Sequence, residues 1–392
     1  MQSAENKNHF SETKTHFQSG NPVLGFRRFL DLALEVGTND IEKNEIMSLC
    51  DSFNNCFDTN TIPSSELINR VLEMDEAYRN RLIPTVLSGI PITSANNISK
   101  TYAGGNFRLE SINMDISGGE LIGIVGENGN GKTTLLRIMA ADLSKDTGEI
   151  EYNFEDNSSL YECKRQIAYI PQRIPRWYGK LKNNLHFAAA GRGVFGFENE
   201  FLVKVMISRL GLSKYKDLYW TQISGGYRTR FELARILLLQ PRLLVLDEPL
   251  ANLDINAQQT FLQDLRYLAK SGKNPLGVIF SSQQLHEVEK VADHIVFLRA
   301  GKSVYNSTTD QSDKLDKHTE VELETDLDRE MILGYLKDIP DITVMSHGGL
   351  FILRCGLETP ASQILKKLVE QNVPINYFRN LTHSTKKFFN EN

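Results

Sequence analysis

Apolar residues recur at helical spacing in the first part of the chain, between residues 22 and 89. One set occupies positions i, i+3, i+4, i+7 and i+8: Phe26, Phe29, Leu30, Ala33 and Leu34. Another set is Ile46, Leu49, Cys50 and Phe53. This spacing puts apolar side chains on one face of a helix. We therefore predict a helical N-terminal extension over residues 1–89, packed on the next domain or on a partner, with the polar segment 1–20 a candidate for disorder.

Residues 90–308 alternate between short apolar runs and amphipathic stretches, which predicts alternating strands and helices. Residues 120–125 are an apolar run typical of a buried strand, and residues 134–141 have the pattern of a helix. The polar, charged segment 309–318 that follows is typical of a linker. The pattern predicts one α/β domain between the helical extension and the linker.

The last part of the chain, residues 319–392, has a different pattern of predicted strands and helices. We predict a strand over residues 319–325 and a helix over 329–339. A hairpin of two strands, 342–346 and 350–354, a second helix over 360–371 and a last strand over 374–379 follow. The order β-α-β-β-α-β is typical of a small ferredoxin-like α+β domain.

Composition is ordinary for a globular protein, with 41% hydrophobic and 24% charged residues in a chain of 392. A net charge of −5 argues against nucleic acid as the main partner. The four cysteines form no C-x-x-C pair, so neither a zinc site nor a disulfide framework is indicated. There is no apolar signal segment, and no run approaches the roughly 18 apolar residues that a membrane span needs. We expect a cytoplasmic protein.

The strongest local motif runs from Gly126 to Thr133 and matches G-x-x-x-x-G-K-[ST] at every fixed position. A predicted strand precedes it and a predicted helix follows, which is the context that a phosphate-binding loop requires. Its glycines allow backbone N–H groups to face phosphate oxygens, and the helix N-terminus adds partial positive charge. Lys132 is expected to reach the β- and γ-phosphates, and the Thr133 hydroxyl to ligate Mg²⁺.

Two carboxylates follow a second apolar run, in the sequence Arg242-Leu243-Leu244-Val245-Leu246-Asp247-Glu248. Asp247 is placed to hold Mg²⁺, directly or through water. Glu248 is placed to act as general base on the attacking water. Together with the phosphate loop, these acids predict a nucleoside triphosphatase.

Between the loop and the acids lies Ile223-Ser224-Gly225-Gly226-Tyr227, close to L-S-G-G-Q, at the start of a predicted helix. With this run the chain resembles the ATP-binding subunit of an ATP-binding-cassette (ABC) transporter. The resemblance covers residues 90–308. It implies the α/β P-loop fold of an ABC ATPase, with a helical subdomain at about residues 173–222 whose groove receives a helix of the membrane subunit.

The resemblance also assigns roles. It implies that Tyr102 stacks on adenine, that Gln172 senses Mg²⁺ and the attacking water, and that residues 251–254 form the D-loop. The implied catalytic residues are Lys132, Gln172, Glu248 and Gln283, and the implied Mg²⁺ ligands are Thr133, Gln172 and Asp247. The implied ATP contacts are Tyr102, Gly126, Glu127, Asn128, Gly129, Asn130, Gly131, Lys132, Thr133, Thr134, Ser224, Gly225 and Gly226.

Two positions depart from the family pattern. Gln283 stands where the family has its switch histidine, and His286, three residues later, is expected to be a surface residue. An amide can donate a hydrogen bond to a phosphate but cannot carry a titrating proton. Tyr227 replaces the glutamine of the signature, and we expect this change to have a mild effect.

The resemblance further implies that two cassettes close head to tail around two ATP molecules. It implies a second cassette, identical or a paralogue, and a separate membrane permease that holds the chain at the inner face of the membrane. Residues 378–389 are similar to the closing segment of exporter subunits, which favours export. Two alternatives remain open: a soluble ABC ATPase without a permease, and a slow nucleotide switch suggested by Gln283.

Overall fold

The computed structural model describes residues 12–82, 91–102, 104, 107–155, 157–251, 253–270, 275–306, 318–347 and 349–382. Residues 309–317 of the predicted linker (309–318), Asn252 of the predicted D-loop and the tail from residue 384 lie outside the described residues. Among the described helices, none is both long and apolar enough to span a membrane.

The N-terminal extension is helical, as predicted. Its described helices are α2 (Glu12–Gln18), α3 (Pro22–Glu35), α4 (Asp40–Asp58) and α5 (Ser65–Arg79). Side chains cap three of them: Asn21 accepts from the backbone of Leu24, Asn39 forms a capping box with Glu42, and Ser64 accepts from Leu67. Of the residues predicted to form the apolar faces, Leu34 is only partly buried. The others are buried: Phe26, Phe29, Leu30, Ala33, Ile46, Leu49, Cys50 and Phe53.

Helix α2 lies inside the segment that we marked as a candidate for disorder, so that expectation is wrong from Glu12 onward. The reason is a tertiary contact that local composition does not reveal. The ring of Phe17 lies 6.2 Å from that of Phe53 and against Gly25, where an added Cβ would come within 2.9 Å of Phe17. The absence of a side chain at Gly25 lets α2 approach α3.

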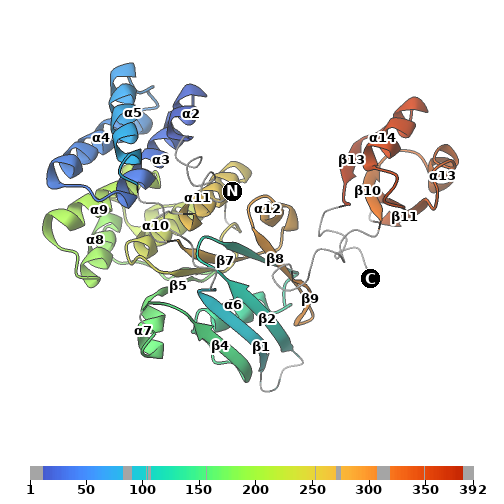
Figure 1. Cartoon of the computed structure of the whole chain (residues 1–392), viewed down its shortest axis with the longest axis horizontal. Helices are drawn as coiled ribbons and strands as arrows, with labels where there is room; N and C mark the ends of the chain where they lie inside the picture. The colour runs from blue at the N-terminus through green and yellow to red at the C-terminus, as the bar shows by residue number, and fades with distance from the viewer. Residues whose placement is uncertain are drawn as a thin grey trace.

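The helical extension packs on the central domain (Figure 1). Helices α3 and α4 contact α9 (Gly196–Arg209), and Phe201 and Val205 of α9 are buried in the same apolar cluster as Phe26 and Phe53. The sequence left open whether this region docks on the cassette or on a partner. The structure shows that it docks on the cassette.

Buried ion pairs reinforce this contact. Arg27 and Arg28 of α3 each donate to the carboxylate of Asp264 in α11 (Ile255–Ala269), at 3.2 Å in both cases. Arg28 also pairs with Asp31 at 2.7 Å, and Asp31 accepts from Arg209 of α9. Burial lowers the pKa of the Arg27 guanidinium, and the Asp264 carboxylate opposes that shift. The network joins the extension to α9 and to α11 at once.

We expect Asp264→Ala to lower the apparent free energy of unfolding by about 3–5 kcal/mol, because it leaves Arg27 and Arg28 buried without that carboxylate. Urea unfolding of the full chain measures the effect. The control is Asp51→Ala, which breaks a 2.6 Å pair with Lys204 in which the Asp51 side chain is 63% exposed. That pair should contribute about 1 kcal/mol or less. Equal losses in the two variants would contradict a structural role for the buried network.

A mixed sheet forms the core of the central domain. Its strand order is β4-β1-β2-β9-β8-β3-β7-β6-β5. The strands are β1 (Thr93–Thr101), β2 (Arg108–Ile116), β3 (Leu121–Val125), β4 (Thr147–Tyr152), β5 (Ile167–Ile170), β6 (Leu243–Leu246), β7 (Gly277–Ser282), β8 (His294–Arg299) and β9 (Lys302–Asn306). Strands β8, β3, β7, β6 and β5 run parallel, and β1 pairs antiparallel with β2 and β4 at the other edge.

The helices of this domain are α6 (Lys132–Met139), α7 (Leu160–Arg165), α8 (Leu181–Gly191), α9, α10 (Gly225–Leu237), α11 and α12 (Leu285–Glu289), with short 3-10 helices at Ser213–Tyr215 and Trp220–Gln222. Helices α8 and α9 fall within the predicted helical subdomain. Helix α6 directly follows the loop after β3. Because β7 lies between β3 and β6, the carboxyl ends of these three strands meet at one edge of the sheet, where parallel α/β sheets bind ligands.

The C-terminal segment forms a separate small sheet with two helices (Figure 1). Its elements are β10 (Thr319–Glu324), α13 (Arg329–Tyr335), β11 (Thr343–His347), β12 (Leu350–Cys355), α14 (Ala361–Glu370) and β13 (Tyr377–Asn380). The order β11-β12-β10-β13 with antiparallel neighbours is that of a ferredoxin-like sheet, as predicted. The first helix ends earlier, and the last strand starts later, than the sequence pattern indicated.

Candidate nucleotide-binding site

The loop between β3 and α6 needs glycine at two positions for steric reasons. Gly131 has a φ of +96°, a left-handed conformation, and it directly precedes the first residue of α6. At Gly126 an added Cβ would lie 2.4 Å from the carbonyl oxygen of Leu298. The loop can therefore run close to the β8–β9 turn, where Asn130 Oδ1 accepts a hydrogen bond of 2.9 Å from the backbone of Ala300.

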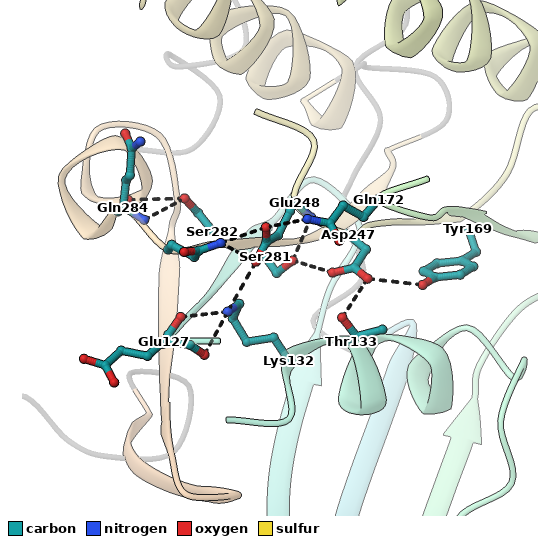
Figure 2. A network of polar contacts seen from close by, with 12 residues as sticks. Glu127, Lys132, Thr133, Tyr169, Gln172, Asp247, Glu248, Ser281, Ser282 and Gln284 are labelled. Carbon is teal, nitrogen blue, oxygen red and sulfur yellow. Dashed lines mark hydrogen bonds and ion pairs between the residues drawn. The ribbon is translucent and has the colours of Figure 1, made fainter. Parts of the chain in front are cut away.

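Lys132, the first residue of α6, is only 5% exposed. Its Nζ donates to the carbonyl oxygens of Gly126, at 2.7 Å, and Glu127, at 3.1 Å. It also lies 3.4 Å from Glu248 Oε1. The loop, the ammonium group and one of the two predicted acids thus meet at one point (Figure 2).

Asp247 is held by hydroxyl groups from three elements. The Thr133 hydroxyl, at the start of α6, lies 2.8 Å from its Oδ2, and the Ser281 hydroxyl of β7 lies 2.9 Å from its Oδ1. The Tyr169 hydroxyl of β5 donates to Oδ2 at 3.5 Å. Burial, and after it the charge of Asp247, raise the pKa of Tyr169, so its hydroxyl keeps its proton. The carboxylate of Asp247 is therefore fixed in direction on both oxygens.

The pair Thr133 and Asp247 has the chemistry of a Mg²⁺ site. A hydroxyl and a carboxylate lie within 2.8 Å of each other beside the phosphate loop. In the part of the chain that the structure describes, no three His, Cys, Asp or Glu side chains gather as a metal site. Mg²⁺ suits such a small protein contribution, because it keeps several waters and takes further ligands from substrate phosphates. The donor set fits the ion that the sequence predicted.

Glu248 is held by two glutamines. Gln172 Nε2 donates to its Oε2 at 2.9 Å, and Gln283 Nε2 donates to Oε1 and Oε2 at 3.0 and 2.9 Å. Figure 2 shows the Gln172 side chain directed at the Glu248 carboxylate. Gln172, which the resemblance also suggested as a Mg²⁺ ligand, here contacts Glu248. The residue at the switch position is thus an amide that orients the predicted base.

The predicted adenine-stacking residue, Tyr102, lies beside helix α6. Its hydroxyl is 3.3 Å from the hydroxyl of Thr134, and the residue is 40% exposed. Its ring is therefore accessible next to the loop, as a stacking residue requires. The stacking itself stays a prediction.

The signature residues stand apart from this cluster. Ser224 precedes α10, which begins with Gly225 and Gly226. Among the described residues, no hydrogen bond or ion pair links these three to the phosphate loop of the same chain. Tyr227, which replaces the family glutamine, packs its ring 3.9 Å from that of Tyr215. One chain thus holds a phosphate loop with its acids, and a signature that makes no described hydrogen bond or ion pair with that loop.

The site contains two residues that the sequence did not single out, Ser281 and Tyr169. Both sit on strands that neighbour β6, and only the strand order brings them to Asp247. His286 is a surface residue as expected, since its side chain is 48% exposed and pairs with Glu287 at 2.8 Å.

Comparison with known proteins agrees with this geometry. A family described as ABC transporter matches residues 109–251. The molybdate/tungstate import ATP-binding protein WtpC of Archaeoglobus fulgidus is 31% identical over 201 residues, covering 51% of this chain and 81% of the relative. The phosphonates import ATP-binding protein PhnC of Treponema denticola is 29% identical, covering 59% and 94%. Several other relatives are longer, and the chain spans 55–60% of their length.

Among solved structures, cbiO1 of Clostridium perfringens, part of the ABC transporter complex cbiONQ, has a TM-score of 0.50 and 23% identity, covering 55% of this chain and 88% of cbiO1. This similarity concerns the fold. The chain belongs to the family of ABC transporter ATP-binding subunits. Members of this family are ATPases that work as dimers with membrane permeases.

Proposed function

We propose that two copies of this cassette, or one copy and a paralogue, close head to tail around two ATP molecules and hydrolyse them to drive a membrane permease. The observation that carries the proposal is the division of the site. Lys132, Thr133, Asp247 and Glu248 lie together in one chain, whereas the signature at Ser224 has no contact with them among the described residues. A second chain would supply the missing signature.

Within each half-site the residues have distinct roles. Lys132 binds the β- and γ-phosphates, and Thr133 and Asp247 hold Mg²⁺. Once bound, Mg²⁺ neutralises charge on the phosphate oxygens. Glu248 takes a proton from the attacking water, and Gln172 and Gln283 keep its carboxylate in the direction needed for that transfer.

The chain would act at the cytoplasmic face of the membrane, held there by its permease. Helices α8 and α9 are the expected docking region, because they lie in the helical subdomain that the family uses for this contact. The curated relatives named above are import proteins, so the export direction favoured by residues 378–389 gains no support from them.

A mixing experiment tests the divided site. Lys132→Ala removes the phosphate-binding ammonium, and Gly225→Asp adds a negative charge at the first turn of α10, where it would repel a phosphate. Each variant alone should be inactive. Mixed dimers contain one intact half-site, formed by the loop of one chain and the signature of the other, so the mixture should regain Mg-ATPase activity. A mixture as inactive as its components would contradict the head-to-tail assembly of two copies of this chain.

The slow-switch alternative depends on Gln283, and replacing that residue tests it. We expect Gln283→Ala to lower the steady-state ATPase rate about tenfold, because two hydrogen bonds to the Glu248 carboxylate are lost. The control is Gln284→Ala, which removes the exposed amide of the neighbouring residue. Equal rates for the two variants would mean that Gln283 does not support turnover.

A further inference from the structure

The hydroxyl of Ser281 lies between the two acids of the site, and the sheet register explains why. Strand β7 pairs with β6 in parallel, with Phe280 opposite Leu246. The next residues, Ser281 and Asp247, are therefore level with each other. Because side chains alternate along strands, neighbours at the same level point to the same face. The register brings the serine hydroxyl next to the aspartate carboxylate.

This hydroxyl makes one donated and one accepted hydrogen bond. It donates to Asp247 Oδ1 at 2.9 Å and accepts from the backbone N–H of Glu248 at 2.8 Å. Ser281 is completely buried, so water has little access to replace either bond. A single buried hydroxyl thus ties together the predicted Mg²⁺ ligand and the backbone of the predicted general base.

The bond to Glu248 matters because of the conformation of that residue. Glu248 has a φ of +47°, in the left-handed region that residues with a side chain rarely occupy. Such a conformation persists only where surrounding contacts impose it. Gln172 and Gln283 hold the carboxylate end of Glu248, and Ser281 holds its backbone end.

We propose that Ser281 is a positioning residue for ATP hydrolysis, which sets the direction of Asp247 toward Mg²⁺ and of Glu248 toward the attacking water. This inference rests on the proposed function, because it assigns Ser281 to the same reaction. Ser281 itself takes no part in proton transfer. Its effect on rate comes through the placement of the two acids, in which shifts of about 1 Å are costly.

The test is Ser281→Ala in the full-length chain. We expect a kcat about 10- to 100-fold lower, because the Asp247 carboxylate loses a donor and the Glu248 N–H is left buried without a partner. The Mg²⁺ concentration for half-maximal activity should rise as well. Equilibrium titration with a fluorescent ATP analogue in EDTA should be unchanged, whereas the gain in affinity on adding Mg²⁺ should shrink.

Two controls separate positioning from folding. Ser281→Thr keeps the hydroxyl, whereas Ser281→Val has the shape of threonine with a methyl group in place of that hydroxyl. The Thr variant should therefore retain activity that the Val variant loses. This comparison stays informative even if Ser281→Ala unfolds the strand. Ser282→Ala removes a hydroxyl of the same strand that bonds the backbone of Gln284, and it should keep kcat within about threefold.

Equal kcat and equal Mg²⁺ dependence for the Thr and Val variants would overturn the proposal, as would equal losses for Ser281→Ala and Ser282→Ala. Failure of the proposed function has a different signature, because the parent chain would then hydrolyse ATP no faster than Glu248→Gln. If the parent rate were well above that blank and the Ser281→Thr and Ser281→Val variants had equal kcat, the role of Ser281 would be rejected and the proposed function would stand.

Discussion

Glu248→Gln is expected to slow ATP hydrolysis by about 10²- to 10⁴-fold while leaving ATP binding nearly intact. The glutamine side chain has almost the same shape, but it cannot take a proton from water. The binding contacts come from other residues, chiefly Lys132 and the backbone of the loop before it. Single-turnover phosphate release measures the chemical step, and equilibrium titration with ATP measures binding. In this variant, chains should also stay associated when Mg²⁺ and ATP are present.

A suitable control is Glu151→Gln, which makes the same chemical change at an exposed position of edge strand β4. Its rate should match that of the parent. If Glu248→Gln turned over ATP as fast as this control, another group would have to accept the proton. Our assignment of the general base would then be wrong.

Lys132→Ala is expected to weaken ATP binding about 30-fold or more. It removes the ammonium group that pairs with the phosphates, and truncating one partner of a buried charge pair costs at least about 2 kcal/mol. Lys132 is nearly buried inside the phosphate loop, where the remaining groups are mostly backbone. The loss should appear in the dissociation constant, measured by titration without turnover. This distinguishes Lys132 from Glu248, whose loss should appear in the rate.

Lys164→Ala is the matched control, since Lys164 is exposed on α7. It should bind ATP like the parent. Normal ATP affinity in Lys132→Ala would show that the glycine loop is not a phosphate site. The assignments of Thr133 and the loop glycines would fall with it.

The local parts of the site could be predicted because their information is local. The run from Gly126 to Thr133 carries its own geometry, with glycines where the backbone turns left-handed or approaches a neighbour, followed by a helix start. The acids Asp247 and Glu248 directly follow an apolar run, which marks a strand end. The ferredoxin-like order of the last domain was also accessible, because it follows from the succession of short elements along the chain.

The order of the strands in the central sheet could not be predicted from these patterns. Ser281 and Tyr169 contact Asp247 only because β7 and β5 flank β6 in the sheet. Each lies in or beside an apolar run that is equally compatible with several strand orders. The neighbour relations had to come from the structure.

The docking of the helical extension was hidden for a similar reason. Asp264 pairs with Arg27 and Arg28 across more than 230 positions of sequence, and no local pattern links α3 to α11. Helix α2 was missed because its stability depends on Phe17 packing against α3 and α4. Periodicity revealed the apolar faces of this region, but not the surface of the cassette that covers them.

The most direct test of the account is the Mg-ATPase rate per chain of the purified protein, measured over a range of protein concentrations with Glu248→Gln as the blank. We predict a rate well above the blank that increases per chain with concentration, because each complete site needs the signature of a second chain. A rate equal to the blank at every concentration would contradict the claim that this chain is an ATP-hydrolysing cassette.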